Sequence, residues 1–395
     1  MICGCYHMNF KKATKDLNLK SNEKLLLKSK SPFAPSHYKD LKPKGFKIYT
    51  FKSGFKKKYD DLLIIKFDKI VNVACKYSLT SMPSAPLIWD KKNNIGNCKA
   101  LIVNSGNANA HTGLQGIKNI NKYVGYLAKL LKCSIKDILV SSTGVIGEQL
   151  DPNKILKKIK LLPFSKEKKL IDASRSITTT DTFLKTSIHN LKIDNQNIKI
   201  YGFAKGSGMI SPNMGTMLAY LFIDCELSSS NLKKILADNI QETFNSITVD
   251  SDTSTSDTVM LFANPIKKIN LRENYDKISN TVFKVMKELS MKIITDGEGL
   301  KKLIKVTVIN AKNKNQSRII AFSIANSPLV KTAIAGEDAN WGRIVMAIGK
   351  TQAKIIQKKI SIKFGNNILA MNGERYKKIN LSKINKYMKN QLIDI

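Results

Sequence analysis

The sequence predicts an α/β fold, because strand-length apolar runs alternate along the chain with stretches of helical periodicity and no segment repeats another. The 395 residues are 43% hydrophobic and 24% charged, which is a globular composition. A chain of this length can bury a large core, so we expect one large domain or two smaller ones.

The expected strands are short apolar runs of the length typical of buried strands. They lie at Leu101–Val103, Ile138–Val140, Met217–Ile223, Val259–Phe262 and Val306–Ile309. A hairpin is expected to turn at residues 194–197, where Asp-Asn-Gln-Asn separates two apolar-patterned arms.

Three stretches predict helices, because their apolar residues recur every three or four positions. The first, Ile117–Leu131, has Ile120, Val124 and Leu127 on one stripe. The others span residues 231–244 and 275–289. Such stripes face a core by default and do not indicate a cofactor surface.

The formal net charge of +36 raises the question of nucleic-acid binding, since positive charge alone gives weak, salt-dependent affinity for polyanions. Specific recognition depends on arginine forks, yet only five of the 66 basic residues are Arg. Lys is abundant throughout, without a basic stripe, as an AT-biased genome would produce. We therefore expect no specific nucleic-acid partner.

The chain is expected to be cytoplasmic. No apolar run approaches the ~18 residues that span a bilayer. The N-terminus lacks the charged-then-apolar order of a secretory signal, and residues 1–40, which we expect to form a basic, unstructured extension, contain no Arg.

No metal site or phosphate loop is expected. The six cysteines and four histidines are scattered, and their nearest approach, Cys3 and Cys5 with His7, lacks a second pair of ligands. Lys350-Thr351 resembles the end of a phosphate loop, but Ile344 stands where that motif requires glycine.

The most informative stretch is Lys205–Leu218, in which a Gly/Ser/Pro/Asn segment ends at Gly215-Thr216 and leads into an apolar strand. Backbone strain is easily stored at glycine. If the bond after Gly215 broke, Thr216 would carry a free α-amino group beside its own hydroxyl, which is a nucleophile and a base in one residue. The alternative is an ordinary loop that leads into an ordinary strand.

Several further segments, in order along the chain, accompany this stretch. They are G-F…G at 45–54 with D-D-L-L-I-I at 60–65, L-I-V-N-S-G-N-A-N-A-H-T-G from Leu101, S-S-T-G-V-I-G from Ser141, T-T-T-D-T-F-L-K at 178–185, F-N-S-I-T-V-D-S-D-T-S-T-S-D-T at 244–258, T-D-G-E-G at 295–299 and G-E-D-A-N-W-G-R at 336–343. Together they resemble the ornithine acetyltransferases of arginine biosynthesis, also called glutamate N-acetyltransferases.

The resemblance implies a layered sheet-helix core of the self-cleaving ornithine acetyltransferase type. It implies a catalytic core at 41–300, a smaller C-terminal α/β domain at 301–395, and self-cleavage into chains 1–215 (α) and 216–395 (β), assembled as α₂β₂. The implied activity is acetyl transfer from N2-acetylornithine to glutamate, without a cofactor. Whether acetyl-CoA also serves as a donor is left open.

The implied chemistry suits the residues. Because an amide is unreactive, a covalent acetyl-Thr216 intermediate divides its barrier into two smaller ones, and an α-amino group with a pKa near ~7.7–8.0 accepts and returns the proton. By resemblance, the Thr143 hydroxyl and the Gly144 N–H form the oxyanion hole, although those residues alone would also fit a plain strand-end turn. Thr182, Lys205, Thr216 and Glu298 match the family's substrate-binding residues.

Two polar runs are interpreted as structural. Asn107 and Asn109 are expected to brace the site through side-chain-to-backbone hydrogen bonds. Asp250, Asp252 and Asp257 lie in an Asp/Ser/Thr run that caps and turns the chain more often than it binds metal.

The sequence departs from the family at three positions and at its C-terminal end. Gly215 stands where Ala is usual, and Ser251 and Ser256 replace Gly and Asn. The family also closes with a W-G-C-D-L and N-A-D-Y-type tail that supplies an Asn and a Ser/Thr to the substrate, whereas this sequence ends at K-N-Q-L-I-D-I. We therefore expect weakened substrate binding or an inactive member. The other readings are a self-cleaving peptidase of related architecture and a Lys-rich binding protein.

Overall fold

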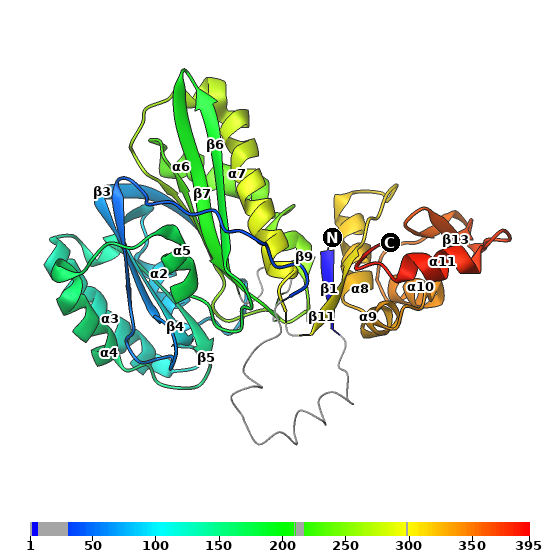
Figure 1. Ribbon diagram of the computed structural model, residues 1–395, viewed down its shortest axis with the longest axis horizontal. Coiled ribbons are helices and arrows are strands. Elements are labelled where there is room, and N and C mark those ends of the chain that lie inside the picture. The colour runs from blue at the N-terminus through cyan, green and yellow to red at the C-terminus, as the bar shows by residue number, and fades with distance from the viewer. Residues whose placement is uncertain (1, 7–30, 209, 211–216, 298) are drawn as a thin grey trace. The chain divides into compact units, whose positions relative to one another are not determined.

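The computed structural model describes residues 2–6, 31–208, 210, 217–297 and 299–395. It confirms the α/β class, with strands and helices along the whole described chain (Figure 1). The chain divides into two compact units. The larger consists of residues 35–245 and 252–293, and the smaller of residues 1–34, 246–251 and 294–395.

The larger unit is built on one extensive sheet. Its strands follow the order β5-β4-β3-β10-β8-β7-β6, and β2 also pairs with β3. The bounds are β2 Phe46–Phe51, β3 Leu62–Tyr77, β4 Asn97–Asn107, β5 Ile138–Val145, β6 Lys185–Ile193, β7 Gln196–Lys205, β8 Leu218–Ile223 and β10 Thr258–Ala263. The pairs β4/β5 and β8/β10 are parallel, and the other neighbours are antiparallel.

The two halves of this sheet face each other across an apolar core. Phe46 on β2 stacks on Phe222 of β8, with ring centroids 4.7 Å apart, although β3 and β10 separate these strands in the sheet order. Alternate residues of β3 explain the layering: Leu63 and Ile65 enter this core, whereas Leu62 and Ile64 pack against the helices outside it.

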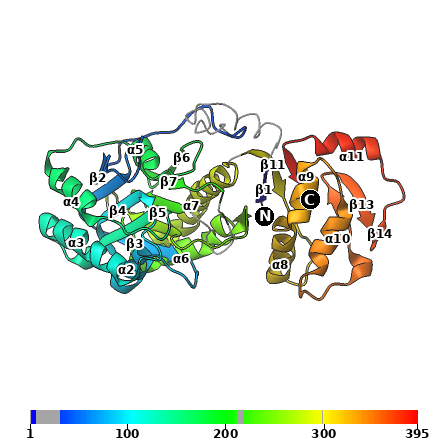
Figure 2. The same ribbon diagram turned by 90° about the horizontal axis from the view of Figure 1, so that it is seen from below.

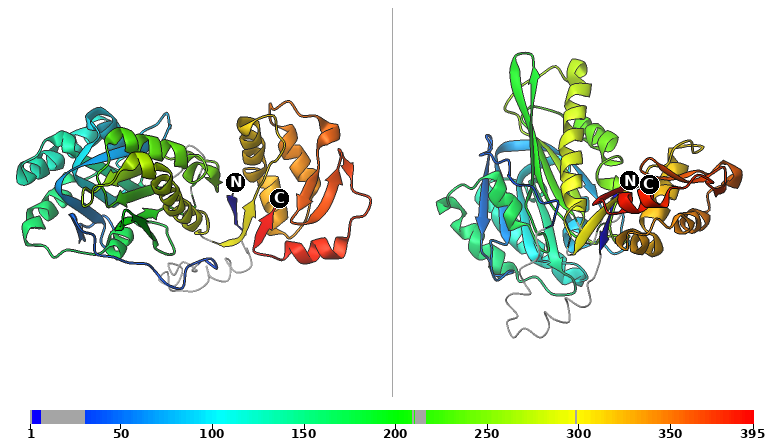
Figure 3. Two further views of the ribbon diagram at one scale, coloured as in Figure 1. Left: turned by 90° about the horizontal axis from the view of Figure 1, so that it is seen from above. Right: turned by 45° about the vertical axis from the view of Figure 1, so that its right-hand side comes forward.

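Helices cover the outer faces of the larger unit, with one exception. The helices are α2 Ala85–Asn93, α3 Gly113–Leu131, α4 Pro152–Leu161, α5 Leu170–Ser176, α6 Ser229–Ile240 and α7 Leu271–Ile294, with 3₁₀ turns at Ile135–Asp137 and Leu162–Phe164. The exception is α5, whose Leu170 and Ala173 pack into the core between the two halves of the sheet. Helices α2, α3 and α4 lie together against the β3–β5 half (Figure 2). Helix α7 runs alongside the β6–β7 hairpin (Figure 3). The layers are therefore helix, sheet, sheet, helix.

Most elements of this unit were predicted. The runs at 101–103, 138–140, 217–223 and 259–262 are β4, β5, β8 and β10, and the three helical stretches are α3, α6 and α7. The hairpin turns at Asp194 and Asn195, both of which have positive φ (46° and 59°), a conformation that Asp and Asn tolerate better than most residues.

The smaller unit contains a sheet in the order β15-β11-β1-β9 and a separate sheet in the order β12-β13-β14. Its elements are β1 Ile2–Tyr6, β9 Ile247–Thr248, β11 Leu300–Lys305, α8 Lys314–Ala325, α9 Pro328–Ala335, α10 Trp341–Gly349, β12 Ile362–Phe364, β13 Asn367–Met371, β14 Glu374–Arg375, α11 Leu381–Met388 and β15 Leu392–Asp394, with 3₁₀ turns at Phe244–Ser246, which begins in the larger unit, and Gln357–Lys359. Helices α8–α11 share one apolar core with β11, β12, β13 and β15.

Two expectations for this unit were wrong. The strand expected at Val306–Ile309 lies at Leu300–Lys305, because the pairing residues of β1 and β15 stand opposite that segment. The apolar pattern alone does not reveal where those partners are. Residues 2–6, expected within an unstructured extension, form β1 between β11 and β9.

The described residues contain no helix that is both long and apolar enough to cross a membrane.

Candidate functional site

The expected oxyanion residues lie where β5 ends beside β4. Gly144 has φ of 136°, and a Cβ added there would come within 2.3 Å of the Gly106 carbonyl carbon. Only glycine permits such a close approach of two backbones. The register also shifts here, since Asn107 pairs with both Thr143 and Val145. Thr143 is buried at this irregular strand end.

Lys205 reaches this point from the end of β7. Its side chain is buried, and Nζ donates a hydrogen bond of 3.3 Å to Thr143 Oγ1. In the β7–β8 register, Lys205 stands opposite Leu218, so the connection between these strands begins and ends beside the same place. A cation and a hydroxyl thus meet where the expected nucleophile's loop departs from the sheet.

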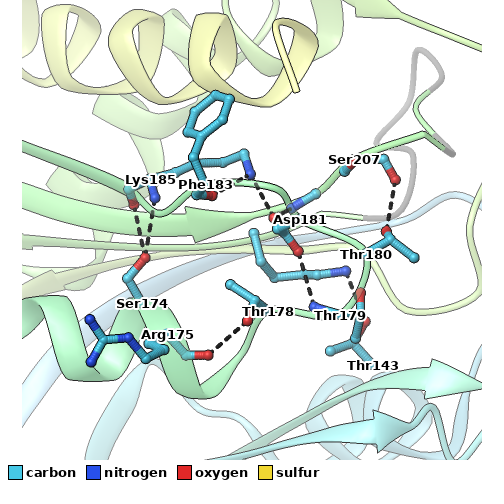
Figure 4. Close-up of polar contacts among 12 residues, drawn as sticks. Thr143, Ser174, Arg175, Thr178, Thr179, Thr180, Asp181, Phe183, Lys185 and Ser207 are labelled. Atoms are coloured by element: carbon cyan, nitrogen blue, oxygen red, sulfur yellow. Dashed lines mark hydrogen bonds and ion pairs between the residues drawn. The ribbon is translucent and has the colours of Figure 1, made fainter. Parts of the chain in front are cut away.

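A buried carboxylate, Asp181, joins the neighbouring segments (Figure 4). Oδ1 accepts from Lys185 Nζ (2.6 Å) and from the backbone N–H of Gly206 (2.9 Å), while Oδ2 accepts from the N–H of Thr179 (3.0 Å). Burial alone would raise the pKa of Asp181, but the charges of Lys185 and Lys205 and the Gly206 N–H hold it well below its usual range.

Lys56 approaches from the loop after β2. This loop folds around the Asp61 carboxylate, which accepts from the backbone N–H groups of all four residues 53–56. Lys56 Nζ then donates to the carbonyls of Ser176 (3.1 Å) and Thr178 (3.0 Å). Burial, assisted by the charge of Lys205, lowers the pKa of Lys56 to about 8, against the opposing effects of Asp61 and Asp181.

Asp257 holds the strand that follows the expected cleavage point. Its Oδ1 accepts from the N–H of Met217 (2.7 Å), and the side chain is fully buried. The N–H of Thr258 donates to the carbonyl of Met217 (3.2 Å). The segment that leads into β8 is therefore held through both the N–H and the carbonyl of Met217.

The structure brings some of the expected site residues together. Thr143 and Lys205 are in contact, and Gly144 follows Thr143 in the chain. Thr182 follows Asp181, whose carboxylate accepts from the N–H of Gly206, the residue after Lys205. Gly215, Thr216 and Glu298, the expected cleavage site, nucleophile and substrate ligand, lie outside the described residues.

The two asparagines make the predicted kind of contact. Asn107 accepts from the N–H of Asn109 (2.8 Å) and donates to the carbonyl of Glu148 (3.1 Å), and Asn109 donates to the carbonyl of Gly116 (3.4 Å). They hold the loop after β4, where Asn109 has φ of 46°. In the Asp-rich run, Asp250 and Asp252 are exposed, in contrast to Asp257.

Sequence reasoning assigned no role to Asp181, Lys185 or Lys56. The first two belong to the T-T-T-D-T-F-L-K segment, which contributes to the family resemblance. That resemblance implied a role for Thr182 and none for the charged residues of the segment. Lys56 carried no local signal, since it belongs to a run of three lysines in a lysine-rich chain. Only burial and contacts distinguish it.

Metal ligands are not gathered in the described part of the chain, where no group of three or more His, Cys, Asp or Glu side chains could hold an ion. Cys75, Cys98, Cys133 and Cys225 are free thiols. Burial raises the pKa of Cys75 and of Cys225 to about 12, which makes both poor nucleophiles.

Comparison with known proteins agrees with the motifs. The ArgJ family model matches residues 47–395. The chain is similar to the arginine biosynthesis bifunctional protein ArgJ of Bartonella henselae, with 43% identity over 362 residues that cover 89% of this chain and 88% of the relative. The protein of the same name from Agrobacterium fabrum is 40% identical over 357 residues, covering 87% and 86% of the two chains.

Among solved structures, ArgJ from Bacillus halodurans is 32% identical, with a TM-score of 0.40. The match covers 43% of this chain and 91% of the Bacillus chain. The ornithine acetyltransferase of Mycobacterium tuberculosis, solved with ornithine, is 22% identical, with a TM-score of 0.36. The match covers 44% of this chain and 97% of the Mycobacterium chain. The family model and the curated relatives span most of the sequence, and the chain therefore belongs to the ArgJ family.

Proposed function

We propose that this chain transfers an acetyl group from N2-acetylornithine to glutamate in arginine biosynthesis, through an acetyl-Thr216 intermediate. Family membership and the name shared by the relatives support the proposal. The structural observation that carries it is the contact of Lys205 Nζ with Thr143 Oγ1 at the root of the β7–β8 connection. In this proposal the lysine binds a substrate carboxylate, and the threonine hydroxyl beside it donates to the oxyanion.

Self-cleavage prepares the site in this proposal. The Thr216 hydroxyl attacks the Gly215 carbonyl, the peptide nitrogen leaves as the α-amine of Thr216, and water hydrolyses the resulting ester. The products are chains 1–215 and 216–395, and Thr216 then has its hydroxyl and a basic amine in one residue.

Acetyl transfer follows in two balanced steps. Thr216 Oγ attacks the acetyl carbonyl while the α-amine takes its proton, and the collapsing intermediate releases ornithine with that proton. The amine of glutamate then attacks the acetyl ester and loses a proton to the α-amine, which passes this proton to Thr216 Oγ as the ester C–O bond breaks. N-acetylglutamate departs.

Each remaining residue has one role. The Thr143 hydroxyl and the Gly144 N–H stabilise the oxyanion, for which one lost donor typically costs about 3–4 kcal/mol of barrier. Lys205 binds the α-carboxylate, and Thr182 and Glu298 bind the rest of the amino acid. No metal or cofactor takes part, acetyl-CoA is a candidate second donor, and the cleaved chains assemble as α₂β₂ in the cytoplasm.

The intact mass of the purified protein tests this proposal, with Thr216→Ala as the control. We expect two fragments that meet between Gly215 and Thr216, absent from the variant, and acetyl transfer from N-acetylornithine by the wild type alone. Acetyl transfer by Thr216→Ala would refute Thr216 as the nucleophile, and an uncut wild-type chain that still transfers acetyl would refute its α-amine as the base. A cut chain that hydrolyses short peptides and leaves N-acetylornithine intact would replace the proposed activity with that of a peptidase.

A further inference from the structure

An ion pair beside the candidate site takes no part in the proposed reaction. Lys185 Nζ lies 2.6 Å from Asp181 Oδ1, and the two side chains are 0% and 1% exposed. Removing two charges from water costs free energy that their attraction often only offsets, so such a pair is weak evidence of a stabilising role. Its purpose is better sought in what it touches.

The carboxylate connects two segments of the site. One oxygen of Asp181 accepts from the N–H of Gly206, the residue that follows Lys205 and opens the β7–β8 connection. The other accepts from the N–H of Thr179, in the segment that carries Thr182. Both oxygens therefore face donors, a requirement that a carboxylate meets and an amide does not.

Lys185 keeps this carboxylate neutralised. Its ammonium also donates to the carbonyl of Phe183 (3.2 Å) and lies 4.8 Å from the centre of the Phe183 ring, so its position is fixed. The second cation whose charge lowers the pKa of Asp181 is Lys205, which points its Nζ at Thr143. Without Lys185, the full attraction of a buried carboxylate would act on Lys205.

We propose that Asp181 and Lys185 are a positioning pair for the ArgJ-type site. Asp181 anchors Gly206 at the start of the β7–β8 connection. Lys185 neutralises the charge of Asp181, so that Lys205 keeps its contact with Thr143. The consequence for acetyl transfer rests on the proposed function. The anchoring of the Gly206 backbone by Asp181 does not depend on that function.

Three variants test the pair: Asp181→Asn, Lys185→Met and the double variant, which removes both charges. Asp194→Asn, an exposed Asp in the β6–β7 turn, is the matched control. The measurements are hydrogen exchange of backbone amides at residues 204–208, the rate of self-cleavage by intact mass, KM and kcat for acetyl transfer, and the midpoint of thermal unfolding.

We expect Lys185→Met to raise KM by roughly fivefold or more with little change in kcat, because Lys205 turns toward Asp181. The double variant restores KM toward the wild-type value and unfolds near the wild-type midpoint. In the double variant, the backbone amide of Gly206 still exchanges its hydrogen faster than in the wild type, and self-cleavage is roughly tenfold slower. The reason is that the side-chain amide at position 181 accepts from only one of the two backbone N–H groups. Asp194→Asn matches the wild type throughout.

Either of two results overturns the inference. One is Lys185→Met that loses thermal stability with KM unchanged, which makes the pair purely structural. The other is a folded double variant with wild-type exchange at Gly206 and wild-type self-cleavage. A wild type that does not transfer acetyl sinks the proposed function, while the exchange and cleavage rates still decide whether Asp181 anchors the loop.

Discussion

At the residue scale, Gly144 shows how one missing side chain shapes the site. Its backbone has φ of 136°, and an added Cβ would also lie 2.5 Å from the backbone nitrogen of Asn107. Any other residue forces β4 and β5 apart at the strand end where Thr143 meets Lys205.

Gly144→Ala is therefore expected to destabilise the protein by about 1–3 kcal/mol and to abolish self-cleavage, because the strain falls on the end of β5, where Thr143 contacts Lys205. Gly125→Ala is the matched control, since outside its own helix no atom of the described chain lies within 4 Å of a Cβ added there. That helix substitution should stabilise the protein by about 0.5–1 kcal/mol. Urea unfolding and intact mass measure both effects. A cleaved Gly144→Ala protein of wild-type stability would contradict this reading.

Lys56 is a second residue whose environment makes it testable. Replacing it with Met removes the donor for two carbonyls, those of Ser176 and Thr178. Ser176 retains a hydrogen bond from Ser105 Oγ (2.6 Å), which leaves the carbonyl of the half-buried Thr178 without this donor. We therefore expect a loss of about 1 kcal/mol, near the lower end of the penalty for an unsatisfied acceptor. Lys57→Met, at the exposed neighbouring lysine, should leave the unfolding midpoint unchanged. Equal midpoints for the two variants would show that the ammonium contributes nothing there.

At the scale of elements, charged side chains join α7 to the β6–β7 hairpin. Glu288 on α7 accepts from Ser187 Oγ (2.6 Å), lies 3.0 Å from His189 Nε2 on β6, and lies 2.8 Å from Lys292 Nζ. Lys292 donates in turn to the carbonyl of Thr186 (2.6 Å). Burial alone would raise the pKa of Glu288, but these donors lower it to about 2.

This contact predicts a pH dependence. A carboxylate whose pKa is lower in the folded state stabilises the fold above its ordinary pKa of 4.5 and loses that effect as the pH falls toward 2. Glu288→Gln should therefore be less stable than the wild type at pH 7, with a difference that shrinks between pH 4.5 and 2. Thermal unfolding across this range measures it, with the exposed Glu226→Gln as the control. A difference independent of pH would rule out ionisation as its source.

Prediction from sequence succeeded where an element's own residues decide its structure. The apolar runs that became β4, β5, β8 and β10 are buried on both faces, and a continuous apolar run is the pattern that such burial requires. The pattern did not predict β11, because the strand contains Lys302. This lysine is buried, and its ammonium donates to the carbonyls of Met388 and Asn390. A lysine looks exposed until the acceptors for its ammonium are known.

At the scale of the whole molecule, the sheet order bears on what self-cleavage would do. Strands β8 and β10 belong to the expected chain 216–395, yet they lie between β7 and β3 of the expected chain 1–215. The pairing of β7 with β8 runs from Lys205↔Leu218 to Ile200↔Ile223. Separating the two chains would break ladders on both sides of the inserted strands.

We therefore expect the two cleaved chains to remain together in native buffer and to separate only in denaturant. Native mass spectrometry and size-exclusion chromatography before and after addition of guanidinium measure this. Fragments that elute separately without denaturant would contradict the sheet order on which the expectation rests.

The sequence by itself determined the α/β class, most strands and helices of the larger unit, and the family whose motifs the chain carries. Through the family resemblance it also named Thr143, Gly144 and Lys205 as expected site residues, and the structure brings Thr143 and Lys205 into contact. Only the tertiary structure placed β1 beside β11 and selected Lys56, Asp181 and Lys185 from a lysine-rich chain. The physical reason is that burial of a charge, and the donor or acceptor that compensates it, come from segments far apart in sequence that meet only through the order of the strands.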